Sequence, residues 1–108
     1  MINAERAFDA LGDPTRRRVF RRLRRGTRSV QAIADGMNVS RSAVSQHLKV
    51  LKSAGLVVVR AEGTRRLYEV DTRSIEALRT WLDGFWDKTL LAFKAAAERA
   101  AAKEREAR

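Results

Sequence analysis

A polar stripe runs along residues 41–54, a segment whose apolar residues recur at helical spacing. Val44, Leu48 and Leu51 stand at i, i+4 and i+7, so one face of this predicted helix is apolar and should pack on a core. The opposite face is polar and carries Ser42, Ser45, Gln46, Lys49 and Lys52. Short hydroxyl and amide groups hydrogen-bond to base edges in a major groove, and lysines bind phosphates. The stripe therefore has the chemistry of a nucleic-acid contact.

The same two faces also occur on an ordinary amphipathic surface helix, so the stripe does not decide the matter alone. Its neighbours favour nucleic acid, because a short capped helix precedes it and a basic hairpin follows. Arg41, at the helix start, could reach a guanine edge or a phosphate. His47 lies at the edge of the apolar face. We interpret it as packing within the fold or contacting a phosphate, since the chain has no second histidine and no cysteine to complete a metal site.

Glycines and capping residues mark the ends of the helices that would position the stripe. Apolar-periodic stretches are followed by Gly12, Gly26, Gly36 and Gly55, as expected of C-terminal caps. Asp13 and Pro14 predict an N-cap and a first helical position, and Ser29 and Ser40 predict two further N-caps. We expect five helices, at about 2–11, 14–25, 30–35, 41–54 and 73–103.

A hairpin is predicted between the fourth and fifth helices. The β-branched run Leu56–Ala61 and the segment Arg66–Val70 are its strands, and residues 62–64 form the turn. Three arginines crowd the tip and its base: Arg60, Arg65 and Arg66. Such a tip can reach a minor groove or the DNA backbone, although charges on a hairpin also protect sheet edges. The predicted fold is mainly α (α+β), a winged helix-turn-helix with five helices and a two-stranded β-wing.

Composition limits the class of protein. A chain of 108 residues, 44% hydrophobic and 33% charged, suits one packed domain, 1–108, rather than a disordered segment. The absence of cysteine excludes disulfides, thiolate metal sites and cysteine nucleophiles. With one histidine and no clustered carboxylates, no enzyme and no cofactor are predicted. Without a signal-peptide pattern or an apolar run of about 18 residues, a cytoplasmic protein with no membrane partner is expected.

The positive charge is unevenly distributed along the chain. The net charge is +10, of which residues 1–26 carry +5, residues 27–70 carry +4 and residues 71–108 carry +1. This asymmetry indicates a polyanion-binding body followed by a C-terminal segment with another role. Simple solubility is the alternative explanation of the charge.

The predicted last helix is too apolar for one buried face. Its large apolar residues are Ile75, Leu78, Trp81, Leu82, Phe85, Trp86, Leu90 and Phe93. A helix of this kind usually packs against a second partner, which here favours a dimer surface with Trp81, Phe85 and Trp86 as anchors. Folding onto its own domain is the alternative. Gly84 inside this helix costs about 1 kcal/mol relative to Ala, and we expect it to permit a close helix crossing.

Three segments together resemble the ArsR/SmtB family of small prokaryotic winged-helix repressors. They are FDALGDPTRRRVFRRL at 8–23, SVQAIADGMNVSRSAVSQHLKVLKSAGLVVVR at 29–60 and EGTRRLYEV at 62–70. The resemblance implies a homodimer built on the first and last helices, with recognition helices in successive major grooves of an inverted repeat. It also implies repression by blocking a promoter. Among matching positions, Ser42, Ser45, Gln46 and His47 face DNA in the family, and Arg65 and Arg66 belong to its wing.

The sequence departs from the metal-sensing members of that family. Ser29, Val30 and Gln31 stand where their cysteines begin, and Asp83 and Asp87 have no accompanying histidine. No metal site is therefore predicted, because two carboxylates alone are weak ligands for a transition metal.

We expect a sequence-specific transcriptional repressor that binds double-stranded DNA as a homodimer; the alternative is a non-specific architectural nucleic-acid-binding protein. The predicted DNA contacts are Ser40, Arg41, Ser42, Ser45, Gln46, His47, Lys49, Lys52, Arg60, Thr64, Arg65 and Arg66. The predicted dimer contacts are Phe8, Leu78, Trp81, Leu82, Phe85, Trp86 and Phe93. No feature of the sequence identifies an inducer or the operator.

Overall fold

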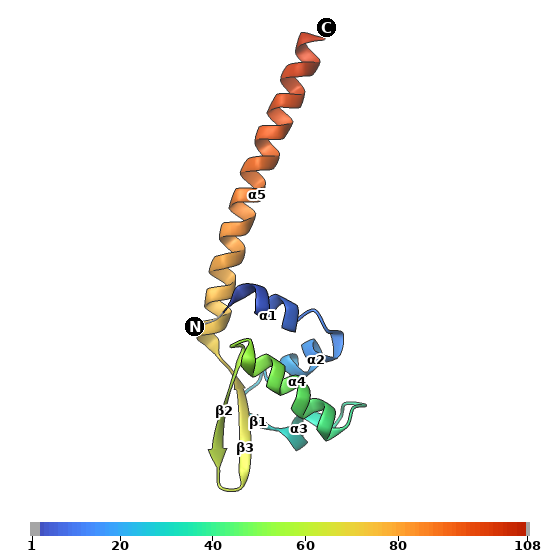
Figure 1. The fold of residues 1–108 in the computed structure, drawn as a ribbon, viewed down its shortest axis with the longest axis vertical. Helices are drawn as coiled ribbons and strands as arrows, with labels where there is room; N and C mark the ends of the chain where they lie inside the picture. The colour runs from blue at the N-terminus through green and yellow to red at the C-terminus, as the bar shows by residue number, and fades with distance from the viewer. Residues whose placement is uncertain (1–2, 108) are drawn as a thin grey trace. The chain divides into compact units, whose positions relative to one another are not determined.

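The computed structural model describes residues 3–107 (Figure 1). Along the chain it contains α1 (Ala4–Ala10), α2 (Pro14–Arg22), β1 (Arg28–Ser29), α3 (Val30–Ala34), α4 (Arg41–Ser53), β2 (Val57–Glu62), β3 (Arg65–Val70) and α5 (Thr72–Glu106). The chain divides into two compact units, Met1–Leu78 and Arg79–Arg108, called here the body and the C-terminal unit. The five expected helices are confirmed. The predicted start of the first helix at Ile2 lies outside the described residues.

Side-chain caps begin the helices of the body where the sequence predicts. The Asp13 carboxylate accepts a hydrogen bond from the backbone N–H of Arg16 at 2.9 Å. Ser29 and Ser40 cap α3 and α4 in the same manner, and each hydroxyl oxygen accepts from a backbone N–H three residues later. Each cap satisfies a donor that the first helical turn leaves without a partner. Helix α2 ends at Arg22, three residues before the predicted end.

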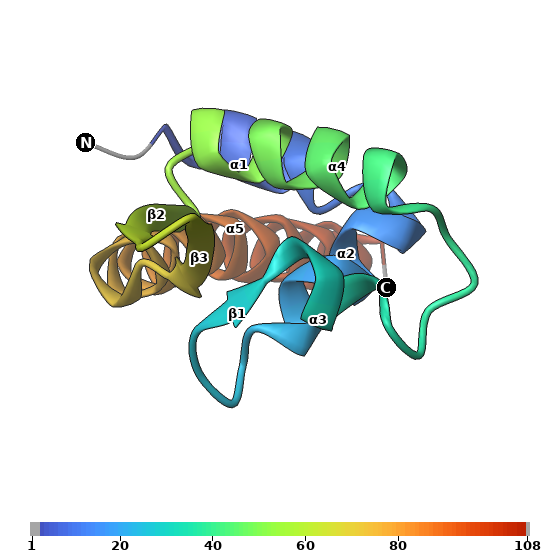
Figure 2. The same ribbon diagram turned by 90° about the horizontal axis from the view of Figure 1, so that it is seen from below.

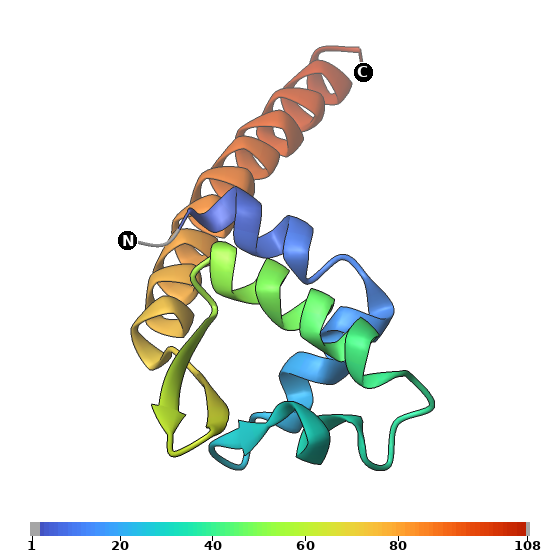
Figure 3. The same cartoon turned by 60° about the horizontal axis from the view of Figure 1, so that its bottom comes forward.

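The core of the body lies between α1, α2, α3 and α4 and extends to β2, β3 and the start of α5. Its largest fully buried side chains are Val19, Leu23, Ile33, Val44, Leu48, Leu51 and Leu56. Figures 2 and 3 show α1 running beside α4, and small residues make this possible, because Ala7 and Ala10 are the buried side chains of α1. Helix α4 is therefore held on several sides.

The sheet has three strands rather than the predicted two. The order is β1-β3-β2, and the short β1 pairs antiparallel with β3 through Arg28↔Tyr68 and Ser29↔Leu67. Two polar residues, the second of which is the cap of α3, show no alternation, so nothing in the local pattern predicts this strand. The hairpin itself is confirmed, with a tighter turn than expected. Gly63 has a φ of +62°, the left-handed conformation that a two-residue hairpin turn requires.

Helix α5 begins against the body and is longer than predicted. The Ser74 hydroxyl donates to the carbonyl oxygen of Gly55, and the backbone N–H of Asp71 donates to that of Leu56 at 2.9 Å. The predicted end of this helix is at about residue 103, and the helix continues through Glu106. Within residues 3–107, every helix is too short or too polar to cross a lipid bilayer.

Candidate nucleic-acid interface

The polar face of α4 is exposed because its apolar face is locked into the core. Val44, Leu48 and Leu51 each have a relative exposure of 0%, and α4 packs on both α2 and α3. Burial of one face fixes the rotation of a helix about its own axis. All five side chains of the predicted stripe are exposed, and so is the apolar Val50 beside them: Ser42, Ser45, Gln46, Lys49 and Lys52 form the stripe. The apolar and polar faces predicted for this helix are therefore confirmed.

The turn that leads into α4 is also well supported. Gly36 has a φ of +82°, a conformation that residues with a side chain rarely adopt. The Arg22 guanidinium donates to the carbonyl oxygen of Asp35 at 2.6 Å and so ties α2 to this turn. Val39 is half-buried against the core, and the exposed Ser40 then caps the helix. The exposed Arg41 follows at the first turn of α4, where the prediction placed it.

His47 is half-buried and sits close to the N-terminus of α2. The hydrogen bond from the backbone N–H of Arg16 lowers the pKa of Asp13 below its ordinary value. Desolvation opposes this effect, and the nearby positive charges of Arg16 and His47 support it. His47 is thus close enough to Asp13 to act on its charge, a position that fits a role in packing the body.

The wing arginines are all exposed, but they do not share one face. In the register of β2 and β3, Arg60 pairs with Leu67 and Ala61 with Arg66. Because side chains alternate along a strand, Arg60 and Arg65 lie on one face of the hairpin and Arg66 lies on the other. Thr64 is exposed in the turn between them. The three arginines, predicted to crowd together at the tip and base of the hairpin, are therefore separated by the pleat.

Known proteins with similar sequences and structures are helix-turn-helix transcriptional regulators. A family profile described as a helix-turn-helix domain matches residues 11–60. The HTH-type transcriptional regulator Rv2034 of Mycobacterium tuberculosis is 51% identical over 89 residues, which cover 82% of this chain and 83% of that protein. An ArsR-like transcriptional regulator from Rhodococcus sp. RHA1 superimposes with a TM-score of 0.74 at 30% identity, covering 87% of this chain and 92% of that one. The chain belongs to the ArsR/SmtB family of winged helix-turn-helix transcriptional regulators.

A further solved relative of this ArsR/SmtB regulator bears on assembly. It is the homodimeric winged helix-turn-helix DNA-binding domain Mb0332 from Mycobacterium bovis, determined in solution. The two proteins are 31% identical, with a TM-score of 0.63 and a coverage of 80% of each chain. In solution, that relative is a homodimer.

The residues predicted at a dimer surface of the regulator are exposed, with one exception. Exposed large side chains include Phe8, Trp81, Leu82, Phe85, Trp86 and Phe93. In the C-terminal unit, the rings of Trp81 and Phe85 stack at a centroid distance of 5.6 Å, and Phe85 meets Trp86 edge to face at 5.7 Å. The exception is Leu78, which is 8% exposed because it packs into the core of the body.

The residues present do not fit the metal sites of the family. Asp83 and Asp87 are exposed on α5, and Ser29 uses its hydroxyl as a helix cap. Among residues 3–107, no three histidine, cysteine, aspartate or glutamate side chains are grouped as ligands of one metal ion.

An arginine-lined cavity was not predicted from the sequence. The arginines between the end of α2 and β1 were considered there only as part of the overall charge, whereas in the structure five of them line one cavity. The run RRLRRGTR at 21–28 was visible in the sequence, but its convergence depends on the turn at 23–26 and on the pairing of β1.

Proposed function

We propose that the protein binds operator DNA as a homodimer and represses transcription by occupying a promoter. The observation that carries the proposal is the exposed polar face of α4, whose opposite face is fully buried. A recognition helix must present short polar side chains while its position is fixed by packing, and α4 meets both requirements.

The side chains of α4 divide the work along the helix. Ser42, Ser45 and Gln46, near the N-terminus, are short enough to reach base edges, and Gln46 can pair bidentately with adenine. Lys49 and Lys52 follow on the same face and would hold phosphates on either side of the groove. The hairpin adds Arg60 and Arg65 from one face and Arg66 from the other, and these reach the backbone or the minor groove beside it.

Dimerisation would place two copies of α4 on one duplex. The exposed aromatic side chains of the C-terminal unit, together with Phe8 on α1, supply the apolar surface for a second copy. The homodimeric Mb0332 domain supports the same assembly. A two-fold dimer matches an inverted repeat whose half-sites are spaced by about 10 base pairs, one turn of the double helix.

Selection of genomic fragments by the full-length protein, followed by competition gel shifts, tests this function. The selected site should be an inverted repeat, bound roughly a thousandfold or more tightly than random DNA at physiological salt. Affinity should also fall steeply as salt rises, because phosphate contacts release counterions. Equal affinity for the selected site and random DNA would instead support a non-specific architectural protein and overturn the proposal.

A further inference from the structure

Five arginines line a cavity at the C-terminal end of α2. The cavity has a volume of about 240 Å³ and is bounded by Arg21, Arg22, Arg24, Arg25 and Arg28. The first two come from the last turn of α2, where cations interact favourably with the helix dipole. The next two lie in the turn after the helix, and the last belongs to β1. Every side chain that lines the cavity is therefore cationic.

The positive charge of the cavity is not neutralised by the chain. Within residues 3–107, no ion pair joins any of these five guanidinium groups to a carboxylate. The carboxylate that contacts this turn, that of Glu69, accepts a hydrogen bond from the Thr27 hydroxyl at 3.0 Å. Guanidinium groups that line one cavity without a counter-charge repel one another, and an anion bound among them relieves that repulsion.

One of the five arginines is already held in position. The Nη2 atom of Arg22 donates to the carbonyl oxygen of Asp35 at 2.6 Å, while its buried Nε has no hydrogen-bond partner among the described residues. Gly36 lies against the same group, since a Cβ there would stand 3.4 Å from Nη2. Arg22 thus lines the cavity with a guanidinium that a hydrogen bond already positions, which is a preorganised feature of an oxyanion site.

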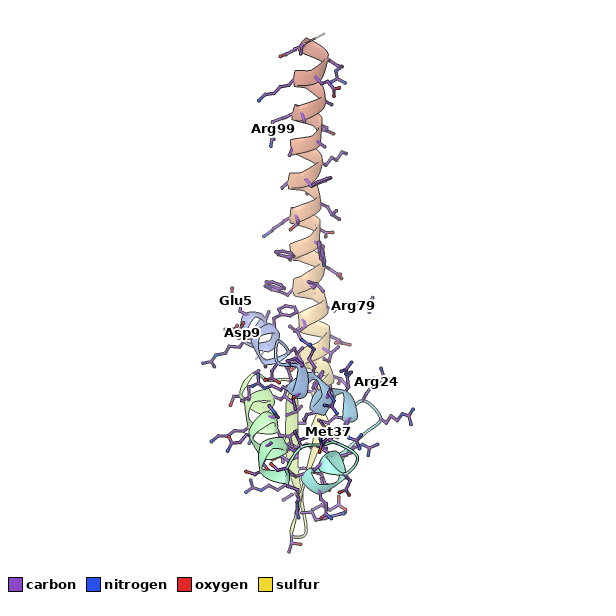
Figure 4. All side chains as sticks on the ribbon, turned by 90° about the vertical axis from the view of Figure 1, so that its right-hand side faces the viewer. Glu5, Asp9, Arg24, Met37, Arg79 and Arg99 are labelled. Carbon is purple, nitrogen blue, oxygen red and sulfur yellow. The ribbon has the colours of Figure 1, made fainter. Side chains whose placement is uncertain are left out.

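The cavity is separate from the exposed face of α4. In Figure 4 the labelled Arg24 points outward from the side of the body away from α4. The cavity volume is large enough for one or two phosphate groups, and the planar fork of Arg matches phosphate oxygens bidentately. We propose that this cavity binds a small phosphorylated ligand through adjacent phosphate groups.

Occupancy of the cavity should influence DNA binding through Arg22. The guanidinium that braces the Asp35 carbonyl is one of the five that a phosphate would engage, and Asp35 begins the turn into α4. A phosphate that competes with the Asp35 carbonyl oxygen for the donors of Arg22 weakens this brace and so lowers affinity for the operator. This step, unlike ligand binding itself, rests on the proposed function.

Isothermal titration of the full-length protein with inorganic pyrophosphate, at constant ionic strength, tests the site. The double variant Arg24→Gln and Arg25→Gln should bind pyrophosphate about tenfold more weakly, because charge-assisted hydrogen bonds are lost. The matched control, Arg18→Gln with Arg99→Gln, removes the same charge at exposed positions outside the cavity and should bind as the unmodified protein does. Equal weakening in both variants, or no binding by the unmodified protein, overturns the proposal.

Operator affinity of the same variants separates a small ligand from a second contact with DNA. Pyrophosphate should weaken operator binding several-fold in the unmodified protein and in the control, but not in the cavity variant. If the cavity variant loses operator affinity more than the control and no protein binds pyrophosphate, the arginines hold the DNA backbone and the proposal is wrong. If no operator is found, the titration alone still decides whether the cavity binds phosphate.

Discussion

Helix α4 and the C-terminal unit use apolar side chains in opposite ways. Val44, Leu48 and Leu51 of α4 are fully buried by the chain itself, which leaves a polar face for solvent or DNA. In the C-terminal unit, Trp86 is 52% exposed and Phe93 is 72% exposed. The body is thus completed by its own residues, whereas exposed aromatic surface on this scale usually belongs to an interface. The stability of the body should come from its own residues, whereas that of the C-terminal unit should depend on association with a second copy.

Leu48→Ala gives the largest expected effect, because it removes a fully buried side chain from the core under α4. The free energy of unfolding should fall by about 2–5 kcal/mol, as lost burial and the remaining cavity add together. Urea denaturation measures this loss. Lys94→Ala, at an exposed polar position on α5, is the control and should change stability by less than about 0.5 kcal/mol. Similar losses in the two variants would erase the contrast between the regions.

Trp86→Ala tests whether the C-terminal unit is completed by a second copy. Loss of a large aromatic anchor should weaken the dimer by about 2 kcal/mol, roughly thirtyfold in the dissociation constant. Sedimentation equilibrium measures that constant, and Lys94→Ala is the control on the same helix. A dimer unaffected by Trp86→Ala would place its interface on another surface.

Gln46→Ala tests the exposed face of α4 in the opposite sense, since it should leave folding intact. Affinity for the selected operator should fall by about 1–3 kcal/mol, and affinity for random DNA should hardly change. Fluorescence anisotropy with both duplexes measures the difference. Gln31→Ala changes the other glutamine, which is exposed on α3, and serves as the control. Equal losses on both duplexes would remove Gln46 from base reading.

Asp13→Ala should lower the melting temperature of the body, because the N-cap of α2 is lost. The pKa of Asp13 is lowered by the hydrogen bond from the Arg16 N–H. The charged form is therefore favoured by folding, so its stabilisation is present above the ordinary pKa of 3.8 and is lost as the pH falls through the lower folded value. Thermal denaturation between pH 2 and 7 should show that Asp13→Asn keeps the cap but lacks this acid-side loss. A pH dependence identical to that of the unmodified protein would contradict the assignment.

Signals between neighbouring residues predicted most of the body, whereas features that depend on contacts between distant residues were missed. The caps at Asp13, Ser29 and Ser40 and the two faces of α4 follow from neighbouring residues and helical period, and all are confirmed. Strand β1 was missed because two residues carry no period and form a strand only by pairing with β3. Leu78 was wrongly assigned to a dimer surface, because the core that buries it is formed by residues far away in the sequence. The arginine cavity could not be predicted either, because it forms only when the turn at 23–26 and the pairing of β1 bring the arginines together.

Gly84→Ala has the smallest expected effect, and its sign is informative. A Cβ at this position would have no neighbour within 4 Å in the chain. The single chain should therefore gain up to about 1 kcal/mol of helix stability from alanine. If Gly84 permits a close crossing with a second copy, dimer affinity should fall despite this gain. The added Cβ would then clash with the partner, since it meets no atom of its own chain. Sedimentation equilibrium and helix content, measured on the same samples, separate the two effects. Unchanged or tighter dimerisation would show that Gly84 does not lie at a helix crossing.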